Sequence, residues 1–158
     1  MPLEIERKFL VTSYTYRDNA QSSQIKQVYL SVRDKMAIRV RIDGMQASLA
    51  IKSKLSERVN REYEYSIPID EARSLMNLDN QLPFISKTRY MVKNEGHTWE
   101  VDEFHADNVG LIIAEIELDD ENETFKIPPW LGEEVTSDYR YLNSNLAVMP
   151  YTKWKKLI

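Results

Sequence analysis

The sequence predicts a mainly β protein of the α+β class, built on a closed barrel of eight antiparallel strands with a charged lumen. Two observations indicate this fold. Eight segments alternate between two kinds of side chain with a period of two, which is the spacing of side chains along a β-strand. Most of these segments also carry charged pairs of one sign on one face, which an ordinary solvated sheet face does not require.

The expected strands are spread along most of the chain. They lie around residues 3–9, 27–32, 38–42, 47–52, 62–67, 87–90, 99–102 and 114–118, and the alternation is weakest in the sixth. Asp43-Gly44 marks a tight hairpin between the third and fourth, because such pairs accept a positive φ. Glu95-Gly96 closes the turn before the seventh.

Helices are a minor part of the prediction. Asp70 can cap a short helix that runs to Leu78. A second helix is expected over 139–147, after the cap candidates at 136–138, and a further helical turn over 151–157.

Composition limits the possible classes of protein. With 158 residues, we expect one domain over 1–158. The 21 basic and 25 acidic residues give a formal net charge of −4, which argues against a nucleic-acid partner. The lack of cysteine excludes thiolate metal sites and cysteine nucleophiles. Without a signal-peptide pattern or an apolar run of ~20 residues, we expect a cytoplasmic protein with no membrane partner.

The charged faces of the strands are the candidate functional surface. Their acidic residues are Glu4, Glu6, Glu62, Glu64, Glu100, Asp102, Glu115 and Glu117, and their basic residues are Lys8, Arg39, Arg41, Lys52, Lys87 and Arg89. Like charges about 6.6 Å apart on one strand repel each other unless counter-charges lie between them. A half-solvated sheet explains any one strand, but the whole set favours a closed barrel whose wet lumen brings opposite charges together.

Such a lumen suits a polyanion held together with metal ions. Carboxylate pairs such as Glu4/Glu6 and Glu115/Glu117 match hard divalent cations, Mg²⁺ or Mn²⁺. Arginine and lysine pairs match phosphate oxygens. Metal ions and several cations around one polyanion are the arrangement that phosphoryl transfer uses.

The inverted pattern leaves apolar residues on the outside of the barrel. The aromatic residues expected there, packed against helices or a second subunit, are Tyr63, Tyr65, Trp99 and Trp130. An exterior of this kind favours a homodimer.

The same charged residues resemble the CYTH superfamily, the triphosphate tunnel metalloenzymes. Residues 4–8, Glu-Ile-Glu-Arg-Lys, match the E-x-E-x-K signature at the N-terminus of that superfamily. The later charged pairs follow in the order that the family shows, and residues 134–141 resemble its closing segment. The ordered set covers essentially the whole chain and is far more specific than the signature alone.

The resemblance implies a tunnel of eight antiparallel strands, often capped by a C-terminal plug helix, that acts on triphosphates with Mg²⁺ or Mn²⁺. By position, the metal would be held by Glu4, Glu6, Glu115 and Glu117, with Glu62, Glu64, Glu100 and Asp102 as further acids. The phosphates would be held by Lys8, Arg39, Arg41, Lys52, Lys87 and Arg89, with Arg140 reaching in from the plug helix. Lys8 and Tyr29 look like the Lys–Tyr pair that helps to activate water in small bacterial relatives.

The expected activity is a metal-dependent triphosphatase acting on inorganic tripolyphosphate, because the compact chain has no evident element to recognise a base. Other reactions stay open, namely cyclisation of ATP to cyclic AMP and hydrolysis of thiamine or nucleoside triphosphates. A polyphosphate-binding module without turnover is a third alternative. The carboxylates argue against it, since simple anion binding does not need them.

Overall fold

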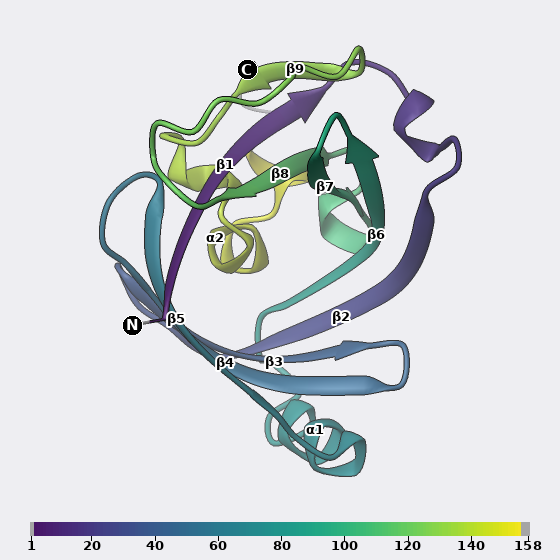
Figure 1. Ribbon diagram of the computed structural model, residues 1–158. Coiled ribbons are helices and arrows are strands. Elements are labelled where there is room, and N and C mark those ends of the chain that lie inside the picture. Colours follow the sequence, from purple (N-terminus) through teal and green to yellow (C-terminus); the bar gives the residue numbers. More distant parts are fainter. Residues whose placement is uncertain (1, 156–158) are drawn as a thin grey trace.

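The strands form one antiparallel sheet that closes on itself. The computed structural model describes residues 2–155. Within them the strand order is β5-β4-β3-β2-β6-β7-β8-β1-β9. β1 (Leu3–Val11) also pairs with β5 (Val59–Ser66), with Leu3 opposite Arg61 and Ile5 opposite Val59, and this closes eight strands into a barrel (Figure 1). The predicted fold class is therefore confirmed.

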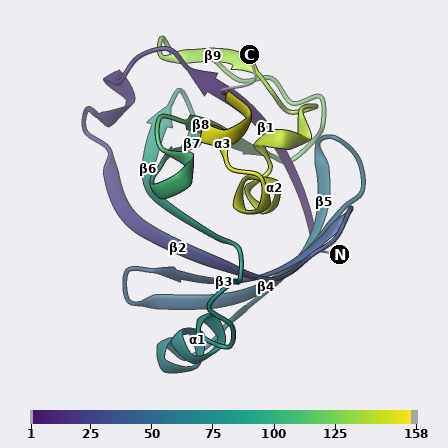
Figure 2. The same cartoon turned by 180° about the vertical axis from the view of Figure 1, so that it is seen from behind.

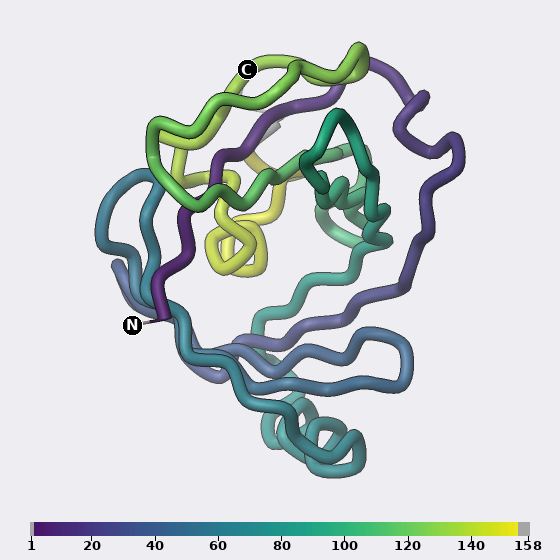
Figure 3. The backbone as a smooth tube through the Cα atoms, in the orientation of Figure 1, coloured from purple at the N-terminus to yellow at the C-terminus, as the bar shows by residue number. Residues whose placement is uncertain are grey.

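The other strands are β2 (Gln21–Val32), β3 (Met36–Asp43), β4 (Gln46–Lys54), β6 (Phe84–Asn94), β7 (His97–Phe104), β8 (Ile112–Leu118) and β9 (Leu131–Glu134). The backbone trace in Figure 3 shows β1 to β8 arranged as a ring. Gly44 and Gly96 have the positive φ angles, 61° and 85°, that the two turn signals predict. β9 is not among the predicted strands, and it pairs with the C-terminal half of β1.

One end of the barrel interior is apolar and is filled by the C-terminal helices. There the inward positions of several strands join α2 (Asn143–Val148) and α3 (Tyr151–Lys155) in one buried cluster, which includes Tyr29, Ile85, Phe104, Ile113, Leu146 and Trp154. Figure 2, which views the molecule from behind, shows both helices across this end of the ring. The charged positions occupy the rest of the interior.

Two further apolar clusters cover the outside of the barrel. Trp99 of β7 packs edge-on against Trp130, with ring centroids 5.6 Å apart, and against Phe125 at 5.4 Å. On the opposite wall, Val40 of β3 lies under Ala72 of α1 (Ile69–Met76). The barrel therefore has the inverted pattern that the sequence predicts, charged inside and apolar outside.

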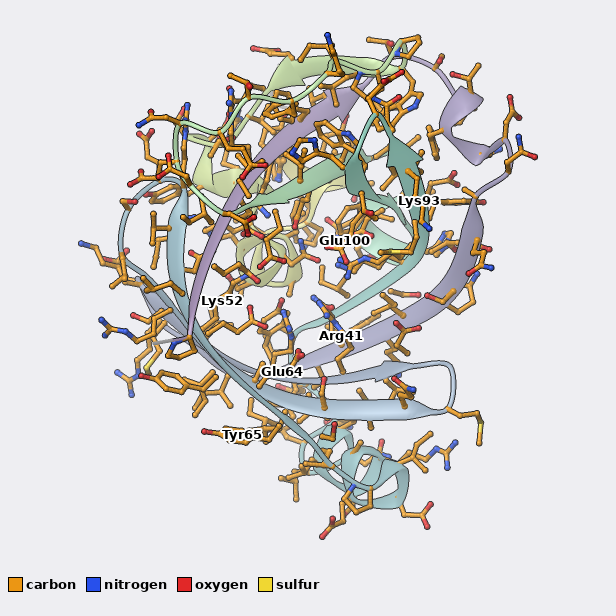
Figure 4. All side chains as sticks on the ribbon, viewed as in Figure 1. Arg41, Lys52, Glu64, Tyr65, Lys93 and Glu100 are labelled. Atoms are coloured by element: carbon orange, nitrogen blue, oxygen red, sulfur yellow. The ribbon has the colours of Figure 1, made fainter. Side chains whose placement is uncertain are left out.

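Two tyrosines on the outer face are left exposed. Tyr63 and Tyr65 of β5 are 40% and 57% exposed, and Figure 4 shows Tyr65 pointing away from the barrel. The homodimer, the single domain over 1–158 and the cytoplasmic location stay predictions.

The helices begin and end at other residues than predicted. α1 begins at Ile69 after Pro68, so Asp70 lies in its first turn and does not cap it. The helix expected over 139–147 is split, because Leu142 is extended, with φ −64° and ψ 135°.

A 3₁₀ turn, η3 (Tyr139–Tyr141), comes before that break, and Asp138 caps it by accepting a hydrogen bond from the backbone N–H of Arg140. α3 begins at Tyr151 as predicted, and the expected residues 156–157 lie outside the described part. None of the helices in residues 2–155 is long and apolar enough to cross a membrane.

Candidate active site

A cavity of about 90 Å³ lies inside the barrel, next to the start of α2. Space of this size accommodates several water molecules or a small anion. Its lining includes the predicted site residues Glu6, Lys8, Tyr29, Arg39, Arg41, Lys52, Lys87, Arg89 and Glu115. Figure 4 shows Arg41 and Lys52 directed into the ring of strands, together with Glu64 and Glu100.

Strand register sets charged residues side by side on β1, β8 and β7. Lys8 lies opposite Glu115, and Glu6 lies opposite Glu117. Glu115 also lies opposite Glu100 on β7. Antiparallel pairing thus joins residues more than a hundred positions apart in the sequence into one charged surface.

Lys8 is buried between two carboxylates. Its Nζ lies 2.5 Å from Oε1 of Glu115 and 3.6 Å from Oε1 of Glu6. Burial favours the neutral amine, but the two carboxylates outweigh it and raise the pKa of Lys8 to about 12. Burial also opposes ionisation of Glu6, but Lys52 and Lys8 lower its pKa to about 2. Both side chains are therefore charged at neutral pH.

Lys52 forms ion pairs with three acidic residues where β1 pairs with β5. Its Nζ lies 2.9 Å from Oε1 of Glu4, 3.5 Å from Oε1 of Glu6 and 3.6 Å from Oε2 of Glu62. Asn60 donates to Glu4 and Glu6 from one amide nitrogen, at 3.2 and 3.1 Å. Burial opposes the charge of Lys52, but these carboxylates prevail and raise its pKa.

Asp102 holds two basic side chains in place. Its Oδ2 lies 2.8 Å from Nζ of Lys87, and Nε of Arg89 donates to its Oδ1 at 2.8 Å. Arg89 also donates to Glu100 at 3.0 Å. Burial opposes ionisation of Asp102, yet the two cations lower its pKa to about 2. For Lys87, burial outweighs the attraction of Asp102 and lowers the pKa to about 7.

Arg41 differs from its neighbour Arg39. Arg39 lies 3.3 Å from Glu64 and 3.6 Å from Glu62. Within residues 2–155, Arg41 has no carboxylate partner, and its Nε donates to Oε1 of Gln27 at 2.9 Å. Burial, and then Arg39 and Arg89, lower the pKa of Arg41 to about 10. A buried cation with uncompensated charge is a ready binding group for an anion.

Two neutral amides link α2 to these cations. Gln27 donates to the hydroxyl of Tyr29 at 2.9 Å and to Oδ1 of Asn143 at 3.2 Å. The same oxygen of Asn143 accepts a hydrogen bond from Lys87 at 2.7 Å. No functional role is predicted from the sequence for Gln27, Asn60 or Asn143. The period-two pattern places Gln27 and Asn60 on the lumen face, but no sequence signal marks Asn143.

The CYTH domain family model matches residues 2–149. The chain belongs to the CYTH domain family. The inorganic triphosphatase of Acetivibrio thermocellus is 44% identical over 156 residues, which cover 99% of this chain and 100% of that protein. The inorganic triphosphatase of Nitrosomonas europaea is 34% identical over 149 residues, covering 92% and 97%.

A solved structure of an inorganic triphosphatase superposes on this CYTH domain with a TM-score of 0.68 at 34% identity, and covers 92% of this chain and 94% of that chain. CYTH triphosphate tunnel metalloenzymes use divalent metal ions.

Most of the predicted site residues of this CYTH domain come together in the lumen. Besides the cavity lining, Glu4, Glu62, Glu64, Glu100 and Asp102 join it through ion pairs with its basic residues. Lys8 and Tyr29 share the cavity, but the lysine contacts Glu115 while the Tyr29 hydroxyl contacts Gln27.

Arg140 lies elsewhere. Its guanidinium pairs with Asp138 at 2.6 Å and stacks over the ring of Trp154, 4.5 Å from the centroid. The side chain is 55% exposed and is absent from the cavity lining. The expectation that Arg140 reaches into the tunnel does not match this position, because the plug turns it outward.

The acids of the CYTH lumen fit a divalent cation by their chemistry. No three acidic or histidine side chains in residues 2–155 already converge on one point. However, Glu6/Glu117 and Glu100/Glu115 are carboxylates directly opposite each other, an arrangement that destabilises a sheet. Partial desolvation of this otherwise exposed side chain, and then four nearby carboxylates, raise the pKa of Glu117, and no cation pairs with it in the described residues. Unbalanced carboxylate oxygens are the ligands that hard divalent cations prefer.

Proposed function

We propose that this CYTH domain is a divalent-metal-dependent triphosphatase that hydrolyses inorganic tripolyphosphate to pyrophosphate and phosphate. The observation that carries the proposal is the cavity inside the barrel, where buried cations lie beside Glu6 and Glu115, each of which is directly opposite another carboxylate in the sheet. Similarity along nearly the whole chain to two proteins named inorganic triphosphatase supports it. The lining of the cavity is mostly charged, which suits a bare polyphosphate.

The basic side chains hold the polyphosphate. Arg41, which has no carboxylate partner in residues 2–155, and Arg39 supply planar guanidinium groups that bind phosphate oxygens in pairs. Lys52, Lys87 and Arg89 add charge from positions that their acidic partners fix before substrate arrives. Groups arranged in advance stabilise a developing charge without reorganising during the reaction.

The acids fall into two roles. Glu4, Glu6, Glu115 and Glu117 would hold the metal, Mg²⁺ or Mn²⁺, with Glu62, Glu64 and Glu100 close by. When bound, the ion would neutralise charge on the phosphate oxygens. We assign Asp102 to positioning, because both of its oxygens already bind basic side chains.

Lys8 and Tyr29 act at the reacting phosphoryl group. The ammonium of Lys8, held by Glu115, contacts the phosphoryl oxygens, and the hydroxyl of Tyr29, held by Gln27, orients the attacking water. Arg140 has no part in this assignment.

The test is phosphate release from tripolyphosphate, ATP and thiamine triphosphate in Mg²⁺, in Mn²⁺ and in EDTA. We expect release from tripolyphosphate with metal and none in EDTA. Lys8→Ala and Glu115→Gln should each lower turnover at least ~100-fold, on the scale of charge-stabilising groups. Glu133→Gln, at an exposed position on β9, is the matched control. Wild-type rates in the lumen variants, or cyclic AMP from ATP as the main product, would contradict the proposal.

A further inference from the structure

The cavity extends to a second group of basic residues that the proposed function does not use. Arg33 and Lys35, in the turn between β2 and β3, and Lys54, at the end of β4, line the cavity beside the start of α2. The backbone ties them together, because the N–H of Arg33 donates to Met36 O and the N–H of Lys54 donates to Lys35 O, both at 2.8 Å. Arg33 and Lys35 are exposed, whereas Lys54 is partly buried.

These cations differ from most of those deeper in the lumen. In the described part of the chain none of the three pairs with a carboxylate, although Asp34 lies in the same turn and lines the same space. Lys54 also lies over the ring of Tyr139, 5.5 Å from its centroid. Burial, and then the charges of Lys8 and Lys52, lower the pKa of Lys54. Among residues 2–155, three cations beside a single carboxylate, Asp34, leave an excess of positive charge in this part of the cavity.

The opposite end of the lumen carries more acids than bases. Glu64, Glu100 and Glu117 lie farther from the plug than Glu62, Asp102 and Glu115 do, since each is two residues along its strand in that direction. Arg41 and Arg89 lie on the same side, and Glu100 pairs with Arg89, whereas Glu117 has no cationic partner in the described residues. The carboxylates at that end would repel a polyanion that extended past them, except where a bound cation neutralised them. The rest of its chain is attracted toward the basic opening beside α2.

We propose that Arg33, Lys35 and Lys54 form an outer phosphate subsite, which binds the phosphates of a linear polyphosphate beyond the three held in the lumen. The inference rests on the proposed function and adds to it a preference for chain length. A longer polyphosphate gains contacts at this subsite, whereas tripolyphosphate does not reach it.

The experiment measures kcat/KM for tripolyphosphate and tetrapolyphosphate in Arg33→Ala/Lys35→Ala. Both residues are exposed, so the variant is expected to fold, and its thermal unfolding is checked. We expect kcat/KM for tetrapolyphosphate to fall about tenfold through KM, while the value for tripolyphosphate stays within about twofold, as suits two partly solvated charges. The charge-retaining Arg33→Lys/Lys35→Arg should behave as wild type.

A matched control removes two exposed lysines outside the cavity, Lys26 and Lys126. Equal losses for both substrates, or no loss for tetrapolyphosphate, would overturn the subsite. A calorimetric titration of tetrapolyphosphate in EDTA separates this proposal from the proposed function. Binding weakened about tenfold in Arg33→Ala/Lys35→Ala supports the subsite even if no hydrolysis occurs, and unchanged binding refutes it.

Discussion

At the scale of single residues, Glu117 occupies an electrostatically unfavourable position, which indicates a functional role. It lies opposite Glu6, and Glu4, Glu100 and Glu62 add to the negative charge around it. Glu117 is the fifth carboxylate of this group, and it pairs with no cation in the described residues. The arrangement becomes favourable when a cation binds among these acids.

Replacing Glu117 by Gln should therefore separate stability from activity. Removing one of the repelling charges should leave the free energy of unfolding unchanged or raise it by up to about 0.5 kcal/mol. Tripolyphosphate hydrolysis should fall at least ~10-fold and require more metal. Urea unfolding and a metal titration of the rate measure the two effects. A variant that is less stable but fully active would show that Glu117 is structural.

We assign Gln27 to positioning the guanidinium of Arg41. Gln27→Leu leaves Nε of Arg41 without its acceptor and removes the donor to Asn143. We expect KM for tripolyphosphate to rise about tenfold, with a smaller change in kcat, because the phosphate-binding guanidinium loses its orientation. Gln24→Leu, three residues earlier and on the outer face of β2, is the control. Equal effects in the two variants would assign Gln27 to stability alone.

The charged residues of the site could be predicted from the sequence, whereas its neutral amides could not. Charged residues stand out because paired like charges on one strand face need an explanation, and so Lys8, Arg41 and Glu117 could be named in advance. Gln27 and Asn143 could not, since a neutral amide fits many environments and their partners come from distant elements. Arg140 was assigned through the family likeness, and its pairing with Asp138 depends on a local turn that the pattern does not encode.

At the scale of elements, the strands were predictable because each has one apolar and one polar face. The observed strands are longer than the predicted ones, because backbone pairing continues past the residues that show the alternation. β9 has only four residues, too few to show a period. The helix break at Leu142 has no signal in the sequence, because residues 139–147 contain neither proline nor glycine and intrinsic propensity does not mark it.

A link between two elements gives a prediction for pH. Glu103 of β7 accepts hydrogen bonds from Tyr16 at 2.6 Å and from Arg17 at 2.7 and 2.8 Å, both in the 3₁₀ turn η1 (Thr15–Arg17). Burial opposes ionisation of Glu103, but these donors outweigh it and lower its pKa below the usual value. The ionised form is therefore favoured in the folded state.

The stabilisation by Glu103 is present above the unfolded pKa of about 4.3 and is lost as pH falls through the folded value. We expect Glu103→Gln to lower the free energy of unfolding by about 1 kcal/mol at pH 7. The difference should shrink as pH falls below about 4. Urea unfolding of both proteins across this range measures it, and a difference that does not depend on pH would contradict the role of the charge.

At the scale of the whole molecule, a barrel with this inverted pattern must bury its apolar exterior under other segments. Its interior charges must be neutralised by ion pairs or bound ligands. On the exterior, α1 packs over one wall of the barrel and the segment around Trp130 packs over another. The interior is only partly balanced, because ion pairs neutralise many charges while Arg41 and Glu117 keep theirs among the described residues. An anion and a cation bound together would complete the balance.

The most direct test is anomalous X-ray scattering from Mn²⁺ in crystals grown with tripolyphosphate. We expect a manganese peak inside the barrel among Glu4, Glu6, Glu115 and Glu117, with phosphate density against Arg39 and Arg41. Manganese found only on the outer surface, with no anion in the lumen, would contradict it.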